Sequence, residues 1–436
     1  MSTVLTIAGT DSIGGAGVAA DLKAFASMDL HGCCVITAVT SQNTQRVSAI
    51  HPVPASVVET QLDAVFDDLR IDAVKTGMIY SAEIAEVVAR KLRKENVPLV
   101  VDPVLCAGVG SSLFREDLKA AMFASLFPLA TVVTPNRMEA EEFSSIGILE
   151  AADSEDACRN IAESGAEAVL LKGGHFEGPM VTDLLLHEGK FTEFTSPRLP
   201  IKVHGSGCTL SSYIAAHLAQ GCGMRQAIAG SKRRVQDAIA MSARLGKGMA
   251  IVNPMATKQK EGLRYPHAVS LRKSIGVARQ HLPLSFVPEN GMDFVYALPN
   301  PQDFSEVCGF EIATPGSIEG CDPGLNISFG SSGWMSRAIL RVNIEHPELL
   351  SGIELRYSTG NEKILLDQGI TEIIAGCDPE NDSLTLTDGT KGPSKQLGLL
   401  SGSLLKWEGM GRAPRLGVLG RDPDDVLRII GPCLDG

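Results

Sequence analysis

The chain has 436 residues, of which 44% are hydrophobic and 21% charged, and its formal net charge is −12. One hydrophobic core stops growing near ~250–300 residues, so this composition predicts two folded domains and excludes a disordered chain. No basic run is longer than 232–234 and no apolar stretch reaches the ~18–20 residues that span a bilayer, which argues against a broad nucleic-acid surface and against a membrane protein.

Short β-rich runs alternate with amphipathic helical patterns through the first half of the chain. The runs predict strands at 4–8, 35–40, 73–76, 99–102, 131–134 and 168–172, and the apolar spacing predicts helices at 56–69 and 83–93. This alternation predicts βαβ units and a largely parallel sheet, hence an α/β fold. Ligands of such sheets bind at the carboxyl ends of the strands, where this chain has polar and glycine-rich segments.

The first predicted strand is followed by a glycine-rich segment from Gly9 to Gly17, which turns into a helix that carries Asp21. The glycines favour a close approach of the backbone to a small acceptor molecule. Asp21 and Gln42 can each offer a hydrogen-bond acceptor to such a molecule, and Gln42 also a donor. For Asp21, a helix-dipole partner in the first turn is the structural alternative.

Polar residues also follow later strands. Asp102 closes the run 99–102, and Asn136 with Glu139 three residues on follows the strand at 131–134. Carboxylates at two neighbouring strand ends suit Mg²⁺, held directly or through its waters, while Asn136 and Glu139 also fit a capping box, and both interpretations can hold together. Lys172 ends the run 168–172, where it can reach phosphate oxygens as a point charge.

The segment His204-Gly205-Ser206-Gly207-Cys208-Thr209 leads into an apolar helix at 213–219. Unpaired amides at a helix start, exposed by glycines, form an anion hole that stabilises the charge on a transferred γ-phosphoryl group. The same field is expected to lower the pKa of the Cys208 thiol and to make it a general base toward a substrate hydroxyl. A glycine-containing helix start with a small buried cysteine explains this segment equally well.

A helix predicted at 224–245 is followed by an irregular segment at 246–254 and a polar one at 257–262. We place the boundary there, which gives domains at 1–254 and 265–436. The second domain begins with a helix-like segment to residue 281 and then alternates again with more Gly and Pro, which predicts a smaller α/β domain. Its arginines Arg337, Arg356 and Arg421 can bind phosphate through their forked donors, although solvated surface arginines are equally common.

Motifs of the first domain resemble, in order, those of bifunctional hydroxymethylpyrimidine/phosphomethylpyrimidine kinases. They lie at 8–12, 14–17, 20–23, 42–44, 75–78, 102–104, 134–136, 171–175 and 204–210. The resemblance implies a ribokinase-like three-layer αβα domain with a mostly parallel sheet, which uses ATP and Mg²⁺ to make the pyrimidine diphosphate in two steps.

Site roles follow from the same resemblance. It implies that the pyrimidine is held by Asp21 and Gln42, with Gly9 beside it and Met78 in its apolar wall. It also implies that Cys208 is the base. The implied anion hole consists of Gly205, Ser206 and Gly207. The implied ligands of ATP are Lys172, Asn136 and Thr209, and those of Mg²⁺ are Asp102 and Glu139. Sugar kinases of this fold more often have Asp at the position of Cys208, whereas some pyridoxal kinases share the thiol, so a pyridoxal-type kinase is the alternative.

The second domain resembles the non-barrel type of thiamine-phosphate synthase that is found fused to this kinase, through motifs at 296–299, 329–332, 336–340, 355–358 and 418–423. That family joins the pyrimidine diphosphate to a thiazole phosphate. The resemblance implies phosphate contacts from Ser331, Ser332 and the three arginines. Gly333 and Trp334 stand where that family commonly has a His, so a domain that only binds thiamine phosphate, as a sensor or assembly module, is the alternative.

The ten cysteines include no CxxC pair and no Cys/His metal spacing, and residues 1–9 are not a secretory signal. Reduced thiols in a cytoplasm fit this pattern. We therefore expect a cytoplasmic homodimer that acts on small molecules (hydroxymethylpyrimidine, its phosphate and thiazole phosphate), with no nucleic-acid or membrane partner.

Overall fold

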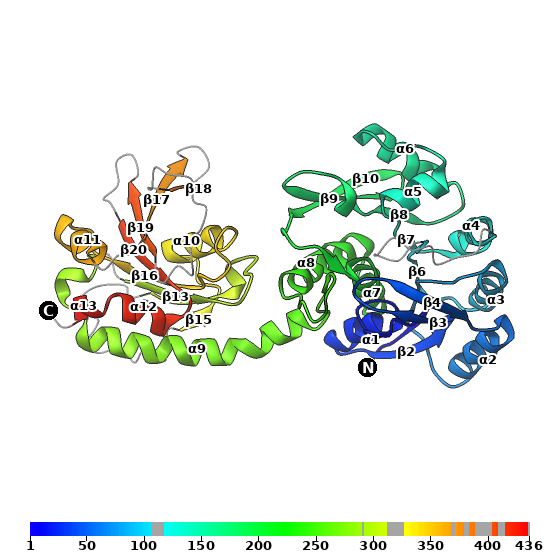
Figure 1. Ribbon diagram of the computed structural model, residues 1–436, viewed down its shortest axis with the longest axis horizontal. Helices are drawn as coiled ribbons and strands as arrows, with labels where there is room; N and C mark the ends of the chain where they lie inside the picture. Colours follow the sequence, from blue (N-terminus) through cyan, green and yellow to red (C-terminus); the bar gives the residue numbers. More distant parts are fainter. Residues whose placement is uncertain are drawn as a thin grey trace. The chain divides into compact units, whose positions relative to one another are not determined.

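The computed structural model describes residues 1–105, 117–289, 292–311, 327–367, 371–378, 383–388, 403–408 and 415–434. The chain forms two compact units, Met1–Lys258 and Gln259–Gly436, which we call the first unit and the second unit and describe separately (Figure 1). None of the described helices is both long enough and apolar enough to cross a membrane.

An eight-stranded sheet forms the centre of the first unit, in the order β10-β9-β8-β7-β6-β5-β1-β2. Its strands are β1 (Thr3–Ala8), β2 (His31–Ile36), β5 (Ala73–Thr76), β6 (Leu99–Val101), β7 (Val132–Val133), β8 (Ala168–Leu171), β9 (Met180–His187) and β10 (Lys190–Pro197). The pairings from β8 to β2 are parallel, and β9 and β10 add antiparallel strands at one edge. Two smaller pairs are β3 (Ala38–Gln42) with β4 (Val47–Pro52), and β11 (Val203–His204) with β12 (Ala250–Ile251).

Helices pack on both faces of this sheet (Figure 1). One face packs against α2 (Ala55–Phe66), α3 (Ala82–Leu92), α4 (Leu118–Ala121), the π-helix η1 (Met122–Leu126), η2 (Phe127–Leu129), α5 (Arg137–Ser144) and α6 (Ala151–Ala162). The other face packs against α1 (Gly17–Ser27), α7 (Ser206–Ala219) and α8 (Met224–Ala240), and a single 3-10 turn, η3 (Gly173–His175), follows β8. The three-layer αβα arrangement predicted from the sequence is confirmed.

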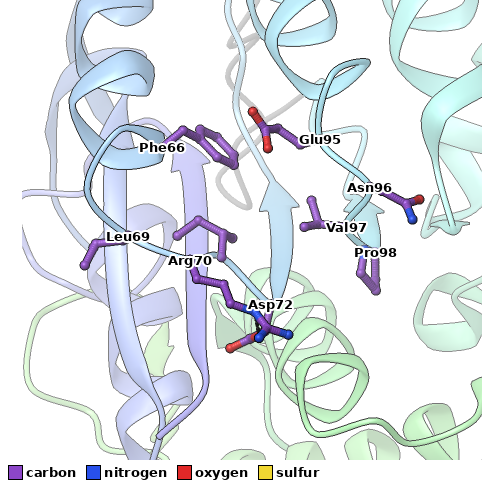
Figure 2. Close-up of a pocket in the computed structure, with 9 residues that line it drawn as sticks. Phe66, Leu69, Arg70, Asp72, Glu95, Asn96, Val97 and Pro98 are labelled. Carbon is purple, nitrogen blue, oxygen red and sulfur yellow. Dashed lines mark ion pairs between the residues drawn. The ribbon is translucent and has the colours of Figure 1, made fainter.

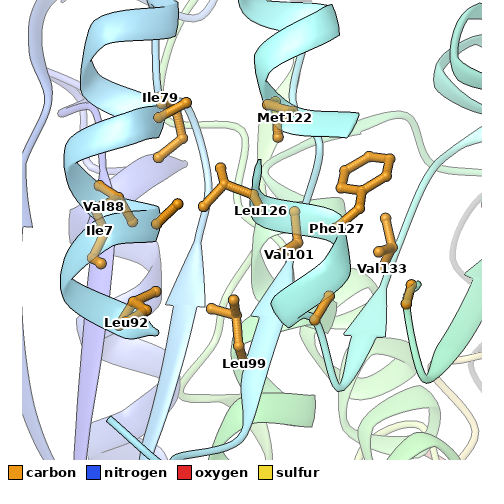
Figure 3. Packing of buried hydrophobic residues seen from close by; sticks show 14 of the residues in the cluster. Ile7, Ile79, Val88, Leu92, Leu99, Val101, Met122, Leu126, Phe127 and Val133 are labelled. Carbon is orange, nitrogen blue, oxygen red and sulfur yellow. The ribbon is translucent and has the colours of Figure 1, made fainter. Parts of the chain in front are cut away.

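Alternation along the strands divides their side chains between two cores. Val101 packs with α3 and η1, for example, while its neighbour Val100 packs with α1 and α7. Figure 3 shows the first of these cores, with Ile7 from β1, Val133 from β7 and Phe127 from η2. Because a parallel sheet is buried on both faces, its strands are apolar at nearly every position, and this is why they were visible in the sequence.

The structure differs from the sequence expectation in three places. The single strand predicted at 35–40 is two strands, since Thr37 interrupts it and donates its hydroxyl hydrogen to the Met78 carbonyl oxygen, 2.5 Å away. The helix predicted at 224–245 ends at Ala240. The polar stretch at 257–262 lies inside the helix α9 (Ala256–His281), because its four central residues, Lys258 to Glu261, are good helix formers and the stretch is free of proline.

The second unit also has an eight-stranded sheet, in the order β15-β14-β13-β16-β20-β19-β17-β18. Its strands are β13 (Asp293–Ala297), β14 (Val307–Glu311), β15 (Ser328–Phe329), β16 (Ser351–Leu355), β17 (Thr371–Asp378), β18 (Ser383–Asp388), β19 (Ser403–Glu408) and β20 (Arg415–Gly420). Among the described pairings only β17 with β19 is parallel.

Helices lie on both faces of this second sheet as well. One face packs against α9 and α12 (Pro423–Ile429), with contributions from η4 (Leu284–Phe286), α11 (Thr359–Leu366) and α13 (Gly431–Leu434). The other packs against α10 (Trp334–Val342), and the turn η5 (Phe304–Glu306) precedes β14. The second unit is thus an α/β domain, as predicted, but its sheet is mainly antiparallel.

Candidate active site

Three ionisable side chains meet at the carboxyl ends of the strands of the first sheet. Lys172 Nζ lies 2.8 Å from Asp102 Oδ1 and 3.8 Å from Glu139 Oε2. Asp102 follows β6, Glu139 lies in the first turn of α5 after β7, and Lys172 follows β8. Since β6, β7 and β8 are parallel neighbours, their carboxyl ends bring these residues together.

Each of these groups has a shifted pKa. Burial alone would raise the pKa of Asp102, but the ammonium groups of Lys172 and Lys75 hold it below its usual value. Burial raises the pKa of Glu139 to about 7. The charge of Lys172 lowers this pKa and the charge of Asp102 raises it further. The pKa of Lys172 is raised, because the two carboxylates outweigh the effect of its burial. At neutral pH the site therefore holds a charged Lys172, an ionised Asp102 and a Glu139 that is close to its midpoint.

The start of α7 adjoins this cluster. Gly205 is its N-cap, and the first helical bond runs from the Thr209 amide to the Gly205 carbonyl oxygen (3.0 Å), so the amides of residues 206–208 have no acceptor within the helix. A Cβ atom placed on Gly207 would lie 3.5 Å from Lys172 Nζ. One turn further on, Ser211 Oγ donates to Asp102 Oδ2 over 3.1 Å. Lys172 and Asp102 therefore lie beside the positive end of the helix.

Cys208 is only partly exposed, and the prediction of a lowered thiol pKa is wrong. Burial raises the pKa of Cys208 to about 11; Lys75 works against this rise, while Asp102 and Asp21 add to it. The sequence showed the helix start that favours a thiolate but not the two carboxylates close by that disfavour it. At neutral pH Cys208 is consequently a thiol.

The structure shows different surroundings for the predicted nucleotide ligands Asn136 and Thr209. Asn136 Oδ1 accepts from the Glu139 amide (3.0 Å) and Glu139 Oε2 accepts from the Asn136 amide (2.8 Å), so the predicted capping box of α5 is confirmed. Thr209 is fully buried and its hydroxyl has no partner among the described residues. Its side chain is therefore enclosed, and the predicted contact of Thr209 with the nucleotide stays a prediction.

The residues predicted for the acceptor molecule are divided between two places. Gly9 and Met78 touch, since a Cβ atom on Gly9 would lie 2.8 Å from Met78 Sδ, and Met78 belongs to a small apolar cluster with Tyr80. Gln42 ends β3, and its amide lies 2.9 Å from Nε2 of His204, the residue before the N-cap of α7. Met78 and Gln42 are thus held by different neighbours.

Asp21 is enclosed by other side chains, which argues against its predicted role as a direct ligand. Its side chain has no exposed surface and accepts hydrogen bonds from Lys75 Nζ (2.9 and 3.0 Å), Thr6 Oγ1 (2.6 Å) and Ser212 Oγ (2.7 Å). With its oxygens so engaged, Asp21 serves as the counter-charge of Lys75. The signal for this pair was a lysine inside the otherwise apolar strand at 73–76, because a buried lysine needs a partner.

In the second unit the predicted phosphate-binding residues do not form one group. Arg356 follows β16 and Arg421 follows β20, and these strands are antiparallel, with Leu355 opposite Leu416. The two arginines therefore lie at opposite ends of the sheet. Arg356 pairs with Glu289 (2.9 Å) and Arg421 with Asp425 (3.1 Å).

The remaining predicted residues of the second unit lie near the start of α10. Ser331 Oγ accepts from Ser336 Oγ (2.9 Å), whereas Ser332 and Arg337 are exposed. The Met335 amide donates to Asp293 Oδ2 (2.8 Å), so a carboxylate already lies at this helix start. That placement disfavours a phosphate there.

A cavity of about 390 Å³ lies at the amino ends of the strands of the first sheet, away from Lys172. Figure 2 shows Asp72, which precedes β5, and Pro98, which precedes β6, in its lining, so it opens at the amino ends of these strands. Across the described part of the chain, no three His, Cys, Asp or Glu residues are grouped to hold a metal ion.

The family model described as phosphomethylpyrimidine kinase matches residues 11–253, more than half of the chain. The chain belongs to the phosphomethylpyrimidine kinase family. We therefore call the first unit the kinase unit. The family model of thiamine-phosphate synthase ThiN matches residues 271–431, within the second unit.

Two curated relatives agree with this assignment. The chain is 45% identical over 253 residues to the thiamine biosynthesis bifunctional protein ThiED of Geobacter sulfurreducens, a match that covers 58% of this chain and about half (52%) of that protein. It is 43% identical over 248 residues to the hydroxymethylpyrimidine/phosphomethylpyrimidine kinase of Rhizobium meliloti, covering 56% of this chain and 92% of the relative.

Solved structures match the kinase unit in the same way. The pyridoxal kinase from Staphylococcus aureus in complex with AMP-PCP and pyridoxal is 32% identical, with a TM-score of 0.56, and the match covers 59% of this chain and 95% of that one. The predicted ribokinase-like fold and the predicted pairing of a kinase with a synthase domain are confirmed.

Proposed function

We propose that the kinase unit transfers the γ-phosphoryl group of ATP to hydroxymethylpyrimidine and then to its monophosphate. In the second unit, the diphosphate is joined to thiazole phosphate, which gives thiamine phosphate and releases pyrophosphate. The observation that carries the kinase proposal is the placement of Lys172 Nζ between Asp102 and Glu139 and beside the amides at the start of α7 that have no acceptor within the helix. Fixed donors of this kind stabilise a phosphoryl group in transfer.

Asp102 and Glu139 are the residues that would hold Mg²⁺. Oxygen donors suit this ion, and it binds through few carboxylates because it keeps much of its water. In this structure the ammonium group of Lys172 is the counter-charge of both carboxylates. A divalent ion would take over that role and would also neutralise charge on the nucleotide phosphates. Lys172 would then be available to the phosphates of ATP.

Cys208, at the first turn of α7, would act on the acceptor. With a pKa of about 11, Cys208 is a thiol at neutral pH and can donate a hydrogen bond; it can accept the proton of the hydroxyl only as a thiolate, after its own proton has passed to solvent. The first acceptor is a neutral alcohol that must lose a proton, whereas the second is an anionic phosphate. The two steps should therefore differ in their need for this residue.

Product analysis with the full chain tests these proposals. ATP and hydroxymethylpyrimidine should yield ADP together with the mono- and diphosphates, and Lys172→Met should reduce the rate at least a hundredfold. If pyridoxal stimulates ATP turnover and hydroxymethylpyrimidine does not, the proposed acceptor is wrong and the pyridoxal-type alternative is right.

A second assay tests the second unit. Addition of thiazole phosphate to the same mixture should produce thiamine phosphate and pyrophosphate. Asp293 at the start of α10 and the separation of Arg356 from Arg421 favour the alternative, a module that only binds thiamine phosphate. Tight binding of thiamine phosphate without its synthesis would establish that alternative. The homodimer and the cytoplasmic location expected from the sequence stay predictions, and sedimentation velocity measures the former.

A further inference from the structure

Two glycine-containing loops of the kinase unit interlock next to the candidate site. One precedes α1 and contains Gly15, and the other precedes α7 and contains Gly205. Gly205 has a φ of 94°, and a Cβ atom there would lie 1.8 Å from the Gly15 carbonyl oxygen. A Cβ atom on Gly15 would in turn lie 2.9 Å from Cδ2 of His204. Any side chain at either glycine would push the two loops apart.

A buried pair of polar side chains joins these loops. Asp11 Oδ2 accepts from the amides of Gly15 (3.0 Å) and Ala16 (2.9 Å), and it lies 3.0 Å from His204 Nε2. The side chains of Asp11 and His204 are 2% and 4% exposed. An oxygen that already accepts from two backbone amides is a carboxylate oxygen, so His204 Nε2 carries the hydrogen and donates it. Burial would raise the pKa of Asp11, but His204 and the backbone amides hold it below its usual value, in agreement with this assignment.

The other ring nitrogen fixes the charge of His204. Nδ1 is buried and has no partner among the described residues. A protonated imidazolium would bury an unpaired N–H there, whereas the neutral ring with its hydrogen on Nε2 leaves only a lone pair. The neutral Nε2–H form is therefore the favoured one.

This tautomer determines the orientation of Gln42. The structure places the nitrogen end of the Gln42 amide 2.9 Å from His204 Nε2. A protonated ring nitrogen cannot accept from an NH₂ group, so the end that faces it must be the amide oxygen, and the single hydrogen on Nε2 is then shared between this oxygen and Asp11 Oδ2. Oxygen and nitrogen of an amide exchange places by a half-turn of the last side-chain bond, and hydrogen bonding decides between them. The NH₂ group of Gln42 then points away from His204, where no hydrogen bond to a described residue engages it.

We propose that Asp11 and His204 are positioning residues for the kinase reaction: they orient Gln42 so that it offers an N–H donor, and not an acceptor, to a ring nitrogen of a heteroaromatic substrate. His204 directly precedes the N-cap of α7, so the same residue ties recognition of the ring to the helix start that faces the phosphoryl group. This inference rests on the proposed function, since it assumes a heterocyclic phosphoryl acceptor.

A double-mutant cycle on the full chain tests whether His204 acts through Gln42. His204→Ala should raise the KM for hydroxymethylpyrimidine about tenfold, as expected for the loss of one oriented hydrogen bond, with the KM for ATP unchanged and kcat within about threefold. In a Gln42→Ala background the same change should have no further effect on KM. Additive effects of the two substitutions, or an equal rise of both KM values, would overturn the proposal.

A matched pair of amide substitutions separates orientation from simple packing. His204→Gln can place an amide N–H near the position of Nε2, whereas His204→Asn places it near Nδ1. We expect His204→Gln to keep the KM within about threefold of the wild type and His204→Asn to behave like His204→Ala. Equal KM values for Gln and Asn would refute the orienting role, and this comparison remains decisive if the Ala variant does not fold.

A further substitution tests which end of the Gln42 amide faces His204. Gln42→Glu keeps an oxygen for His204 but offers an acceptor where the NH₂ group was, so its KM should be at least as high as that of Gln42→Ala. A KM equal to that of the wild type would show that the assigned polarity is wrong. If the wild type phosphorylates pyridoxal in place of hydroxymethylpyrimidine, the proposed function fails, but the same cycle can be measured with pyridoxal, so the two failures are distinguishable.

Discussion

Replacement of Asp21 by Asn should destabilise the kinase unit and not merely weaken substrate binding. The side chains of Asp21 and Lys75 have no exposed surface, and their charges lie 2.9 Å apart. Removal of one partner of a buried ion pair leaves the other charge without compensation, which costs about 3–5 kcal/mol. At about 2–4 °C per kcal/mol for a domain of this size, the melting temperature of the kinase unit should fall by about 10 °C.

The chain contains an internal reference for this measurement. Its two tryptophans, Trp334 and Trp407, both lie in the second unit. Circular dichroism follows the unfolding of both units, whereas tryptophan fluorescence follows the second unit alone. In the Asp21→Asn variant, the circular-dichroism transition of the kinase unit should move to lower temperature. The fluorescence transition of the second unit should stay at the wild-type temperature.

Asp29→Asn is the matched control for Asp21→Asn. Asp29 forms an exposed ion pair with Lys258 over 2.6 Å, so the same chemical change there should cost less than about 1 kcal/mol. Adding Lys75→Met to Asp21→Asn should restore part of the lost stability, since no unpaired charge remains. An unchanged melting temperature of Asp21→Asn together with a raised KM for the pyrimidine would refute our reasoning and restore Asp21 as a substrate ligand.

Three further predictions concern the candidate site. Cys208→Ala should slow phosphorylation of hydroxymethylpyrimidine at least tenfold more than that of its monophosphate, and equal losses in a single-turnover assay would reject its role toward the alcohol. Asp183 accepts from the Gly173 amide (2.8 Å) and from Lys232 Nζ (2.7 Å), so Lys232→Met should disturb the turn after Lys172 and raise the KM for ATP severalfold, with the pyrimidine KM as the control. Because Glu139 has a pKa of about 7 and gains a proton below it, the Mg²⁺ concentration for half-maximal rate should rise as the pH falls from 8 to 6, and Glu139→Gln should abolish this dependence.

The sequence predicts best what depends on short segments. The strand at 73–76 is found where it was predicted, since its apolar residues are buried on both faces of the sheet. Asp102 and Lys172 end parallel strands, and Glu139 lies in the first helical turn after the strand between them, so the three come together at the carboxyl ends of these neighbours. The capping box of α5 needs only residues three positions apart.

Contacts between distant segments are what the sequence could not provide. Lys75 lies 54 positions from Asp21, and His204 lies 193 positions from Asp11, so neither pair leaves a local pattern. The pKa of Cys208 was mispredicted for the same reason, because the carboxylates that raise it belong to other elements. In the second unit, the antiparallel course of β16 and β20 separates arginines that looked equivalent along the chain.

The helix α9 determines where the chain can be divided without damage. Lys260, in the early turns of this helix, is 2% exposed and lies 2.8 Å from Glu306, so these turns belong to the fold of the second unit. A fragment that starts at residue 265, where the sequence first suggests a domain to begin, would discard this lysine and so remove the buried ion pair that it forms with Glu306. Studies of the isolated synthase-like part should therefore begin the polypeptide upstream of Ala256, so that the whole helix is retained.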